Sequence, residues 1–417
     1  MESTDAKSNR QPINKKPIKN FKRMKTKIVY CVPHLFILGG IERVITLKAN
    51  YLADILGYEV YIITADGGDK EPYFKLSSDI KVINLNINFD EIYKEPFLKQ
   101  ISQYFIKQKQ FKKKLKETLF RIRPDITISL VRREINFINS INDGSIKLGE
   151  IHVNKMNSRK FRGEETNNSL KRLIEKLLRR KLIKKLKKLD QFIVINNEDK
   201  EQWYELNNVT VISNPLPSFP TKKSDCTTHQ VIAVGRHSYQ KGFDLLIKSW
   251  NLVSQKHPDW TLKIYGEGEG TELNNQIKSL NLQKNCFLEH PVNNIIDKYC
   301  ESSIFVLSSR YEGFGMVIAE AMSCGVPSVS FACPCGPRDI IKDKVDGLLA
   351  EPENISDLAE KICYLIENES IRKEMGEKAR INVQRYRIEN IMNQWDKLFK
   401  SRLKNYRKLN NTLKKDK

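Results

Sequence analysis

The sequence lacks a long apolar segment. No stretch approaches the roughly 18 consecutive apolar residues that a membrane-spanning helix needs. Residues 1–23 are polar, basic and proline-containing, and they lack the apolar segment of a signal peptide. We therefore expect a cytoplasmic protein in which residues 1–23 form a disordered basic arm.

The cysteines show no recognisable pattern. All eight are irregularly spaced, and the only close pair, Cys333 and Cys335, flanks Pro334. This spacing is not that of a disulfide framework or of a paired CxxC zinc site. A reducing compartment is the simpler interpretation.

Acidic residues are scarce relative to basic ones. The chain has 72 Lys and Arg against 50 Asp and Glu, which gives a formal net charge of +22. Such a surplus favours polyanionic partners such as nucleic acid, anionic lipid headgroups or phosphorylated substrates. The hydrophobic content of 40% and the aromatic content of 9% are those of a globular protein, and 417 residues suffice for two or three domains.

Short β-branched runs alternate with longer helical patterns along most of the chain. The runs before residue 214 are KIVYCVP, EVYIITA, IKVINLNI, DITISL, IKLGEIHV, QFIVIN and VTVISNP. Those after residue 228 are QVIAVGR, LKIYGEG, CFLEHP, IFVLSS, PSVSFACP and GLLAEP. This alternation predicts two doubly wound, Rossmann-like α/β domains with mainly parallel sheets.

A change of composition marks the domain boundary. Residues 214–228 concentrate proline, serine and threonine without apolar periodicity, and they predict a linker between domains at 24–213 and 229–385. Apolar residues at helical spacing predict a packed helix within 386–417. A return of this helix to the first domain is compatible with the pattern but does not follow from it.

Residues 169–190 combine a basic face with an apolar stripe. Ten Lys or Arg lie between Lys171 and Lys188, opposed by Glu175 alone. Two interpretations remain open. The segment is either a crossover helix with a solvated basic face or a helix that docks on anionic membrane, where each basic residue contributes roughly 1 kcal/mol. Nucleic acid is not favoured, because no aromatic residues are interleaved with the charge.

Glycine and basic residues follow several predicted strands, at the sheet edge where open α/β sheets bind ligands. After the first strand, Gly39 and Gly40 precede a helix whose free N–H groups attract anions. A tight turn would explain this pair about as well.

The second domain has two comparable loops. Arg236 and Lys241 bracket a turn after QVIAVGR, where two cations suit a diphosphate, although solvated loop cations are the alternative. Gly266 and Gly268, after the next strand, would allow close approach of the backbone to a ligand. No GxGxxG pattern stands at the first strand-to-helix turn, so this is not a dinucleotide fingerprint.

The stretch SSRYEGFGMVIAE holds two glutamates in unequal settings. Glu312 lies in a loop after the strand IFVLSS, whereas Glu320 lies within a short helix that ends near Gly325. Peptide N–H groups between them can point into a cleft, and the helix terminus favours negative charge by roughly 0.3–1 kcal/mol. Two carboxylates in this setting are suited to accepting hydrogen bonds from hydroxyl groups.

Taken together, these motifs resemble the retaining glycosyltransferases of family 4, which have the GT-B fold. The resemblance rests on GGIERV, GRHSYQKGFDLLI and EGFGMVIAEAMSCGVPSV, and it covers about residues 24–400. The run SFACPCGPRDIIKDKVDGLLAEPENISDLAEKI looks like members that add galactose, glucose or their N-acetylamino forms to bacterial surface glycans. It implies transfer from a nucleotide sugar, expected to be UDP-linked, to a glycan or polyprenyl-linked acceptor.

The resemblance also implies roles for individual residues. Arg236 and Lys241 would bind the diphosphate of the donor, and Glu320 would bond the ribose hydroxyls. Glu312 would lie beside the transferred sugar, as a catalytic residue. Further donor contacts would come from the Gly39 and Gly40 loop of the acceptor-side domain and, in the nucleotide-sugar-binding domain, from Gly266, Gly268, Gly313, Phe314, Gly315 and Met316.

Two histidines enter through the same resemblance. Family members often have a histidine near the donor sugar in a Glu-His-Asn setting, whereas this chain reads GEIHVNK, with Ile151 between Glu150 and His152. A catalytic role for His152 is therefore implied, with a structural histidine as the alternative. His290 lies where the family places backbone contacts to the base.

The implied mechanism needs neither a metal nor a cofactor. The family's retention of configuration is attributed to same-face attack by the acceptor without a protein nucleophile. The sequence has no Asp-x-Asp pair at a strand end of the kind that metal-dependent transferases use. Two other functions remain alternatives, namely a GT-B-type UDP-sugar epimerase and a non-catalytic basic protein that binds membrane or polyanions.

Overall fold

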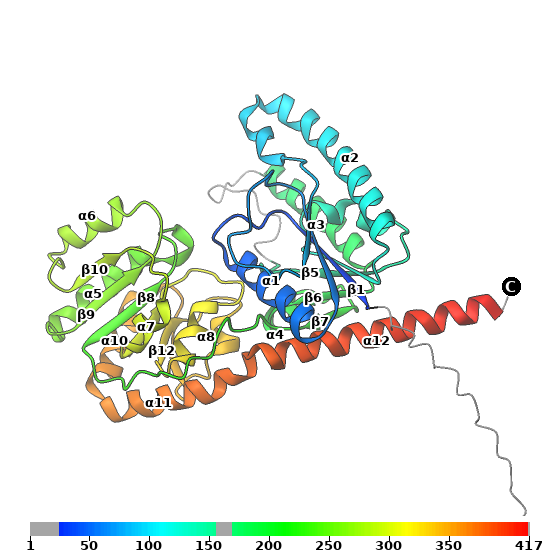
Figure 1. Ribbon diagram of the computed structural model, residues 1–417. Coiled ribbons are helices and arrows are strands. Elements are labelled where there is room, and N and C mark those ends of the chain that lie inside the picture. The colour runs from blue at the N-terminus through cyan, green and yellow to red at the C-terminus, as the bar shows by residue number, and fades with distance from the viewer. Residues whose placement is uncertain (1–24, 156–168, 416–417) are drawn as a thin grey trace, which may run out of the picture.

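The computed structural model describes residues 25–155 and 169–415 (Figure 1). The predicted arm at 1–23 lies outside these residues. Within them, no helix is both long and apolar enough to cross a membrane.

The first sheet has seven parallel strands in the order β3-β2-β1-β4-β5-β6-β7. Each strand falls on one of the predicted β-branched runs. They are β1 (Lys27–Val32), β2 (Glu59–Thr64), β3 (Lys81–Asn84), β4 (Ile126–Ser129), β5 (Ile146–Glu150), β6 (Gln191–Val194) and β7 (Val209–Val211).

Helices cover both faces of this sheet. Successive strand residues point to opposite faces, and apolar residues on both faces are buried beneath helices. Tyr30 of β1 packs with α1 and α12 on one face, and Cys31 packs with α2 and α3 on the other. The helices are α1 (Gly40–Asn50) with a π-helical extension (Tyr51–Ile55), α2 (Phe97–Ile122), α3 (Ser169–Leu186) and α4 (Asn197–Gln202), with 3-10 turns at Phe89–Lys94, Glu134–Asn136 and Ile138–Ser140.

The second sheet has six parallel strands in the order β10-β9-β8-β11-β12-β13. These are β8 (Gln230–Val234), β9 (Thr261–Tyr265), β10 (Cys286–Glu289), β11 (Ile304–Leu307), β12 (Ser328–Phe331) and β13 (Gly347–Ala350). Val306 packs with α5 and α10 on one face, and Phe305 with α7 and α8 on the other. The prediction of two doubly wound α/β domains is confirmed.

Helices of 4 to 14 residues surround this second sheet. They are α5 (Phe243–Lys256), α6 (Thr271–Ser279), α7 (Ile295–Cys300), α8 (Met316–Ser323), α9 (Pro337–Ile340), α10 (Ile355–Glu367) and α11 (Glu369–Asn382), with 3-10 turns at Tyr239–Lys241 and Val383–Tyr386. The loops that bear Lys241 and Glu312 precede α5 and α8, respectively.

The last helix, α12 (Ile388–Lys415), leaves the second domain and runs along the first (Figure 1). Its Trp395 and Phe399 are fully buried in the core cluster that also contains Tyr30 of β1. The Tyr58 hydroxyl donates a hydrogen bond to Asp396 at 2.7 Å. This helix therefore links the two domains through one continuous apolar core.

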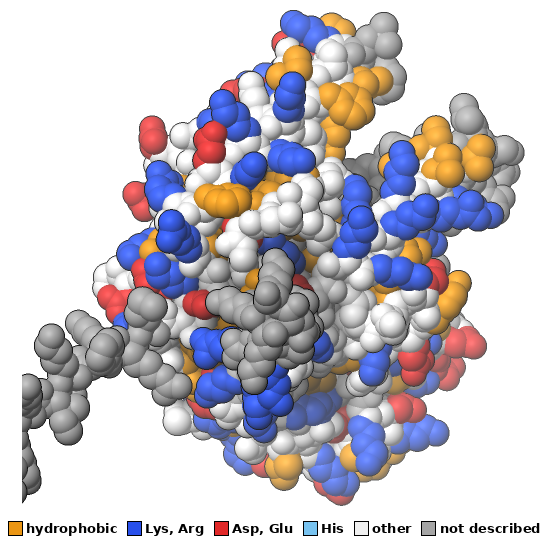
Figure 2. Space-filling view, turned by 90° about the vertical axis from the view of Figure 1, so that its right-hand side faces the viewer, with side chains coloured by type: hydrophobic (Ala, Val, Ile, Leu, Met, Phe, Trp, Pro, Cys, Tyr) orange, Lys and Arg blue, Asp and Glu red, His pale blue; other side chains and the backbone are white. Residues whose placement is uncertain are grey.

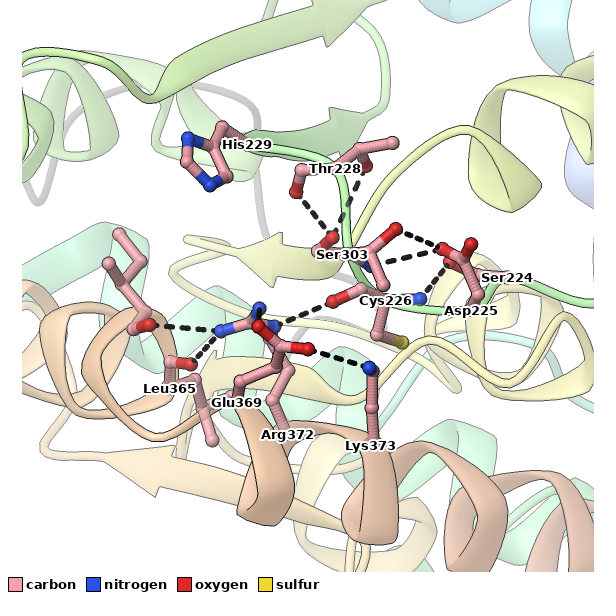
Figure 3. Close-up of polar contacts among 12 residues, drawn as sticks. Ser224, Asp225, Cys226, Thr228, His229, Ser303, Leu365, Glu369, Arg372 and Lys373 are labelled. Atoms are coloured by element: carbon pink, nitrogen blue, oxygen red, sulfur yellow. Dashed lines mark hydrogen bonds and ion pairs between the residues drawn. The ribbon is translucent and has the colours of Figure 1, made fainter.

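The connection between the sheets is held against the second domain (Figure 3). Arg372 of α11 is 2% exposed and donates hydrogen bonds to the carbonyl of Cys226 at 3.0 Å and to those of Leu365 and Ile366 at 2.6 and 3.0 Å. Ser224 donates to the Ser302 carbonyl at 2.6 Å. Near its end, at Ser224 and Cys226, the predicted linker 214–228 is thus hydrogen-bonded to the second domain.

We expect Arg372→Ala to lower the free energy of unfolding by about 3 kcal/mol, because three buried carbonyl groups lose their donor. Urea unfolding followed by circular dichroism measures this loss. Lys373→Ala is the matched control. Its side chain is 44% exposed and pairs with Glu369 at the surface, so the change should cost less than about 0.5 kcal/mol. Equal midpoints for the two variants would contradict the assignment.

Candidate active site

Each sheet reverses its strand order at one point, between β1 and β4 in the first and between β8 and β11 in the second. The connections from such neighbours go to opposite faces, which leaves a crevice at their carboxyl ends. Lys241 follows β8 and Glu312 follows β11. The topology of the second sheet therefore brings these two side chains to the same crevice.

Glu312 is buried and paired. Its Oε1 accepts hydrogen bonds from Lys241 Nζ and from the Ser309 hydroxyl, both at 2.7 Å. Only 6% of the residue is exposed. The sequence-based prediction assigned Lys241 to a diphosphate, and the structure adds that this cation pairs with Glu312.

Glu320 is also buried, and its partner comes from the other domain. Arg43 of α1 donates from Nη1 to Glu320 Oε1 at 2.9 Å, and the Tyr299 hydroxyl lies 3.5 Å from Oε2. Burial raises the pKa of the Glu320 carboxyl, and the Arg43 charge opposes that rise. Each glutamate is therefore paired with a different cation. Glu312 pairs with Lys241 of the second domain, and Glu320 pairs with Arg43 of the first.

The backbone between the glutamates packs against the first domain. A side chain at Gly313 would lie 2.4 Å from the His152 carbonyl oxygen, which only glycine avoids. Asn196 donates to the Gly313 carbonyl at 2.8 Å, and Asn154 donates to the Glu312 carbonyl at 3.3 Å. The backbone of the first domain therefore approaches Gly313 closely.

The remaining residues of this loop lead into α8. Phe314 is buried against the ring of Tyr386, with centroids 5.1 Å apart. Gly315 has a φ of 94°, a conformation that favours glycine, and Met316 begins α8. The free N–H groups at the start of α8 thus lie between Glu312 in the preceding loop and Glu320 in the helix.

In the first domain, Gly39 and Gly40 stand where the sequence placed them, at the start of α1. A side chain at Gly39 would meet Glu42 Oε2 at 2.1 Å, and Glu42 Oε1 in turn lies 3.2 Å from His34 Nδ1. Glu42 Oε2 is the end of a flexible side chain, so this contact by itself does not require glycine at position 39, and Gly40 has open space around it.

The loops after β8 and β9 carry the predicted donor residues Arg236, Gly266 and Gly268. Arg236 is exposed and has no acidic partner among the described residues. A side chain at Gly266 would meet the Gly235 carbonyl at 1.8 Å, and one at Gly268 would meet His237 at 3.0 Å. The close approach at both glycines is thus made by the neighbouring loop. His290 is exposed at the end of β10.

His152 belongs to a buried charged cluster beneath this crevice. Glu150 accepts from Lys48 Nζ at 2.5 and 2.7 Å, and its Oε1 lies 3.2 Å from His152 Nε2. Lys48 is fully buried and sits 3.8 Å from the centroid of the Trp395 ring. Burial raises the pKa of Glu150, but Lys48 and His152 outweigh this effect and bring it to about 2.

Two further features lie outside the crevice. A cavity of about 510 Å³ at the carboxyl ends of β1 to β3 is lined by Phe36, Asp66 and Lys70, among others. In the described residues, one group of side chains has metal-ligand chemistry, formed by His257, Cys363 and Glu367 around α5 and α10. Its His257 and Glu367 already pair at 3.1 Å, and it stands apart from the glutamates.

Sequence reasoning missed three contributors to this region. Arg43 stood in the quoted motif GGIERV without an assigned role, and Glu150 was noted only because its spacing to His152 departs from the family pattern. Lys48 carried no signal at all, because a lysine in a helix is usually solvated. Their roles depend on contacts between residues about 100 or more positions apart, such as the Lys48–Glu150 pair.

Known proteins are similar to this chain in sequence and in fold. Residues 218–382 match the family described as Glycosyl transferases group 1. An uncharacterized glycosyltransferase of Haemophilus influenzae is 30% identical over 88% of this chain and 98% of its own length. The GalNAc-alpha-(1->4)-GalNAc-alpha-(1->3)-diNAcBac-PP-undecaprenol alpha-1,4-N-acetyl-D-galactosaminyltransferase of Campylobacter jejuni is 28% identical over 86% of this chain and 94% of its own.

Among solved structures, a mutant of Staphylococcus aureus TarM in complex with fondaparinux, alpha-GlcNAc-glycerol and UDP superposes with a TM-score of 0.70. It is 20% identical, and the superposition covers 90% of this chain and 99% of that one. At this identity the likeness concerns the fold alone, and it confirms the GT-B architecture.

The Lys48–Glu150 pair yields a pH-dependent prediction. Removing one partner of a buried ion pair costs about 3–5 kcal/mol, so Glu150→Gln should lower the free energy of unfolding by that amount at pH 7. The pKa of Glu150 lies below its ordinary value of 4.5. Its stabilisation is therefore present above pH 4.5 and is lost as the pH falls through about 2.

Urea unfolding of the parent and of Glu150→Gln at pH 7 and pH 3 checks this expectation. The difference between them should shrink at pH 3. The double change Lys48→Met with Glu150→Leu should recover most of the loss, because no buried charge is then left unpaired. A difference that stays constant between the two pH values would refute the ionised pair.

Proposed function

The chain belongs to the GT-B glycosyltransferases, and on this premise we propose that it transfers a hexose or N-acetylhexosamine from a UDP-sugar to a glycan or polyprenyl-linked acceptor. The name of the Campylobacter relative describes transfer of N-acetylgalactosamine to a glycan linked to undecaprenol diphosphate. The similar TarM structure was solved with UDP. None of the similar proteins named above is an epimerase, so that alternative is not favoured.

One observation carries the proposal. Glu312 and Glu320 flank the start of α8 in the crevice where the second sheet reverses its strand order and faces the first domain. Lys241 lies 2.7 Å from Glu312 and can shift its charge to a phosphate oxygen when a donor enters. The ribose would lie at Glu320 and the transferred sugar at Glu312.

The chemistry follows from the charge that develops on the leaving group. When the bond between sugar and UDP breaks, the diphosphate becomes more negative, and Lys241, Arg236 and the start of α8 would stabilise that charge. We infer that a divalent ion is not needed for this step. Glu312 would position the sugar, and transfer would proceed by same-face attack with retention.

His152 would act from the first domain, beside the transferred sugar. Glu150 Oε1 lies 3.2 Å from His152 Nε2. The backbone carbonyl of His152 contacts Gly313, in the loop between β11 and α8. The acceptor would approach from the same domain, and the cavity of about 510 Å³ beyond β1 to β3 offers polar groups for it, including Asp66.

A membrane-facing surface would suit a polyprenyl-linked acceptor. In the first half of α3, Leu173 and Leu177 are 53% and 46% exposed, and in that of α2, Phe105 and Ile106 are 67% and 50% exposed. Two projections on this face carry apolar side chains next to Lys and Arg (Figure 2). We propose that residues 169–190, together with α2, dock on anionic membrane at its cytoplasmic side.

A donor screen tests the activity. We expect UDP-Gal, UDP-GalNAc, UDP-Glc or UDP-GlcNAc to raise the melting temperature, and UDP to be released once an acceptor is supplied. Stabilisation by GDP-Man alone would contradict the UDP assignment, and release of a free epimer without acceptor would contradict transfer.

The same screen tests the assignment of Lys241. Lys241→Ala should weaken UDP binding by about ten- to a hundredfold, because a charge-assisted contact to phosphate is lost. Lys248→Ala is the matched control, an exposed lysine on α5 that lies away from the crevice. Calorimetry with UDP measures both, and equal affinities would remove Lys241 from the donor site.

Vesicle binding tests the docking surface. Four exposed lysines of the first domain are changed to Gln, namely Lys181, Lys184, Lys187 and Lys188. Affinity for vesicles with anionic lipid should fall on the order of a thousandfold, since each of the four basic residues contributes roughly 1 kcal/mol and about 1.4 kcal/mol is tenfold. The control changes four exposed lysines of the second domain, Lys248, Lys256, Lys278 and Lys284. Similar binding by both variants would exclude docking through α3.

A further inference from the structure

Arg43 reaches across the cleft to a carboxylate of the other domain. It lies in the first turns of α1, and its Nη1 is 2.9 Å from Glu320 Oε1 in α8. The Arg43 side chain is 36% exposed, whereas that of Glu320 is 4% exposed. The contact therefore joins a partly solvated cation to a carboxylate that has almost no access to water.

The Arg43 charge favours the ionised form of Glu320, whereas burial disfavours it and raises the pKa of this carboxyl group. A protonated carboxyl group uses one oxygen as a donor and is a weaker acceptor than a carboxylate, so it is less suited to vicinal hydroxyls. The other nearby cation, Lys241, pairs with Glu312 at 2.7 Å. The Tyr299 hydroxyl lies 3.5 Å from Glu320 Oε2, which is a weak contact.

Arg43 is also part of the helix start that carries the glycine loop. Its backbone N–H donates to the Gly39 carbonyl at 3.0 Å. The Arg43 side chain that contacts Glu320 and the loop at Gly39 therefore belong to the same helical turn. A displacement of this turn away from the second domain would remove the cation from Glu320. The state of Glu320 is thus coupled to the closure of the cleft.

We propose that Arg43 is a positioning residue of the nucleoside site, which holds the Glu320 carboxylate ionised and oriented for the ribose hydroxyls of the donor. The site for the nucleoside is then complete only when the two domains are closed. This inference rests on the proposed function, because it needs Glu320 to bind ribose. It adds that the first domain takes part in recognition of the nucleoside as well as of the phosphates.

A second ion pair between the domains supplies a control. Arg338 of the second domain pairs with Glu198 of the first, away from Glu320. If Arg43 served only to tie the domains together, then removing either arginine would weaken the binding of every nucleotide to a similar extent. If Arg43 acts through Glu320, its removal affects only ligands that carry the ribose hydroxyls.

The experiment compares UDP with 2′,3′-dideoxy-UDP by calorimetry on the full chain. The parent protein should prefer UDP by about ten- to a hundredfold, the value of charge-assisted hydrogen bonds to the diol. In Arg43→Ala this preference should fall to within about twofold, while affinity for the dideoxy ligand stays unchanged. Arg43→Lys, which keeps the charge, should retain part of the preference, and Arg338→Ala should retain all of it.

Each other outcome has a defined meaning. A parent that binds UDP and dideoxy-UDP equally would remove Glu320 from the ribose and overturn the inference. A parent that prefers UDP, with the same preference in Arg43→Ala, would overturn the role of Arg43 and leave the proposed function intact. A parent that binds no UDP would overturn the UDP assignment and the inference together. Circular dichroism verifies folding, and Arg43→Lys provides the comparison if Arg43→Ala does not fold.

Discussion

The contact between Gly313 and the His152 carbonyl is the constraint on which the cleft depends. Any side chain at position 313 would overlap that oxygen, so the loop after β11 can lie against the loop after β5 only because this residue is glycine. Asn154 and Asn196 then donate to the backbone on either side of the peptide. These contacts hold the loop after β11 against the first domain, and they thereby position Glu312 and Glu320 next to that domain.

Charge inside the molecule is arranged in pairs, although the chain as a whole is strongly basic. Glu150 has Lys48, Glu312 has Lys241, and Glu320 has Arg43. Each carboxylate is buried, and an unpaired charge there would be costly. The first pair lies within one domain beneath His152, the second within the other, and the third spans the cleft. Among the described residues, exposed lysines such as Lys181 and Lys248 lie outside these pairs.

Much of the fold was predictable, because the periodicity of a strand is a local property of the sequence. Each predicted β-branched run, from KIVYCVP to GLLAEP, contains a strand, and the parallel arrangement follows from the intervening helices. The positions of Glu312 and Glu320, in a loop and in the helix after it, were also predictable, because Gly315 and Pro327 bound that helix. The return of α12 was not, because an amphipathic stripe does not identify the surface that covers it.

By itself, the sequence determined two parallel α/β domains, the loops that hold the candidate donor residues, and the excess of basic charge on α3. These depend on residue order over a few turns of chain. Only the tertiary structure decided which cation accompanies which carboxylate, and that the space beside Gly313, Gly266 and Gly268 is taken up by protein backbone. The reason is physical: an ion pair such as Arg43 and Glu320 forms between residues 277 positions apart, where spacing along the chain carries no information.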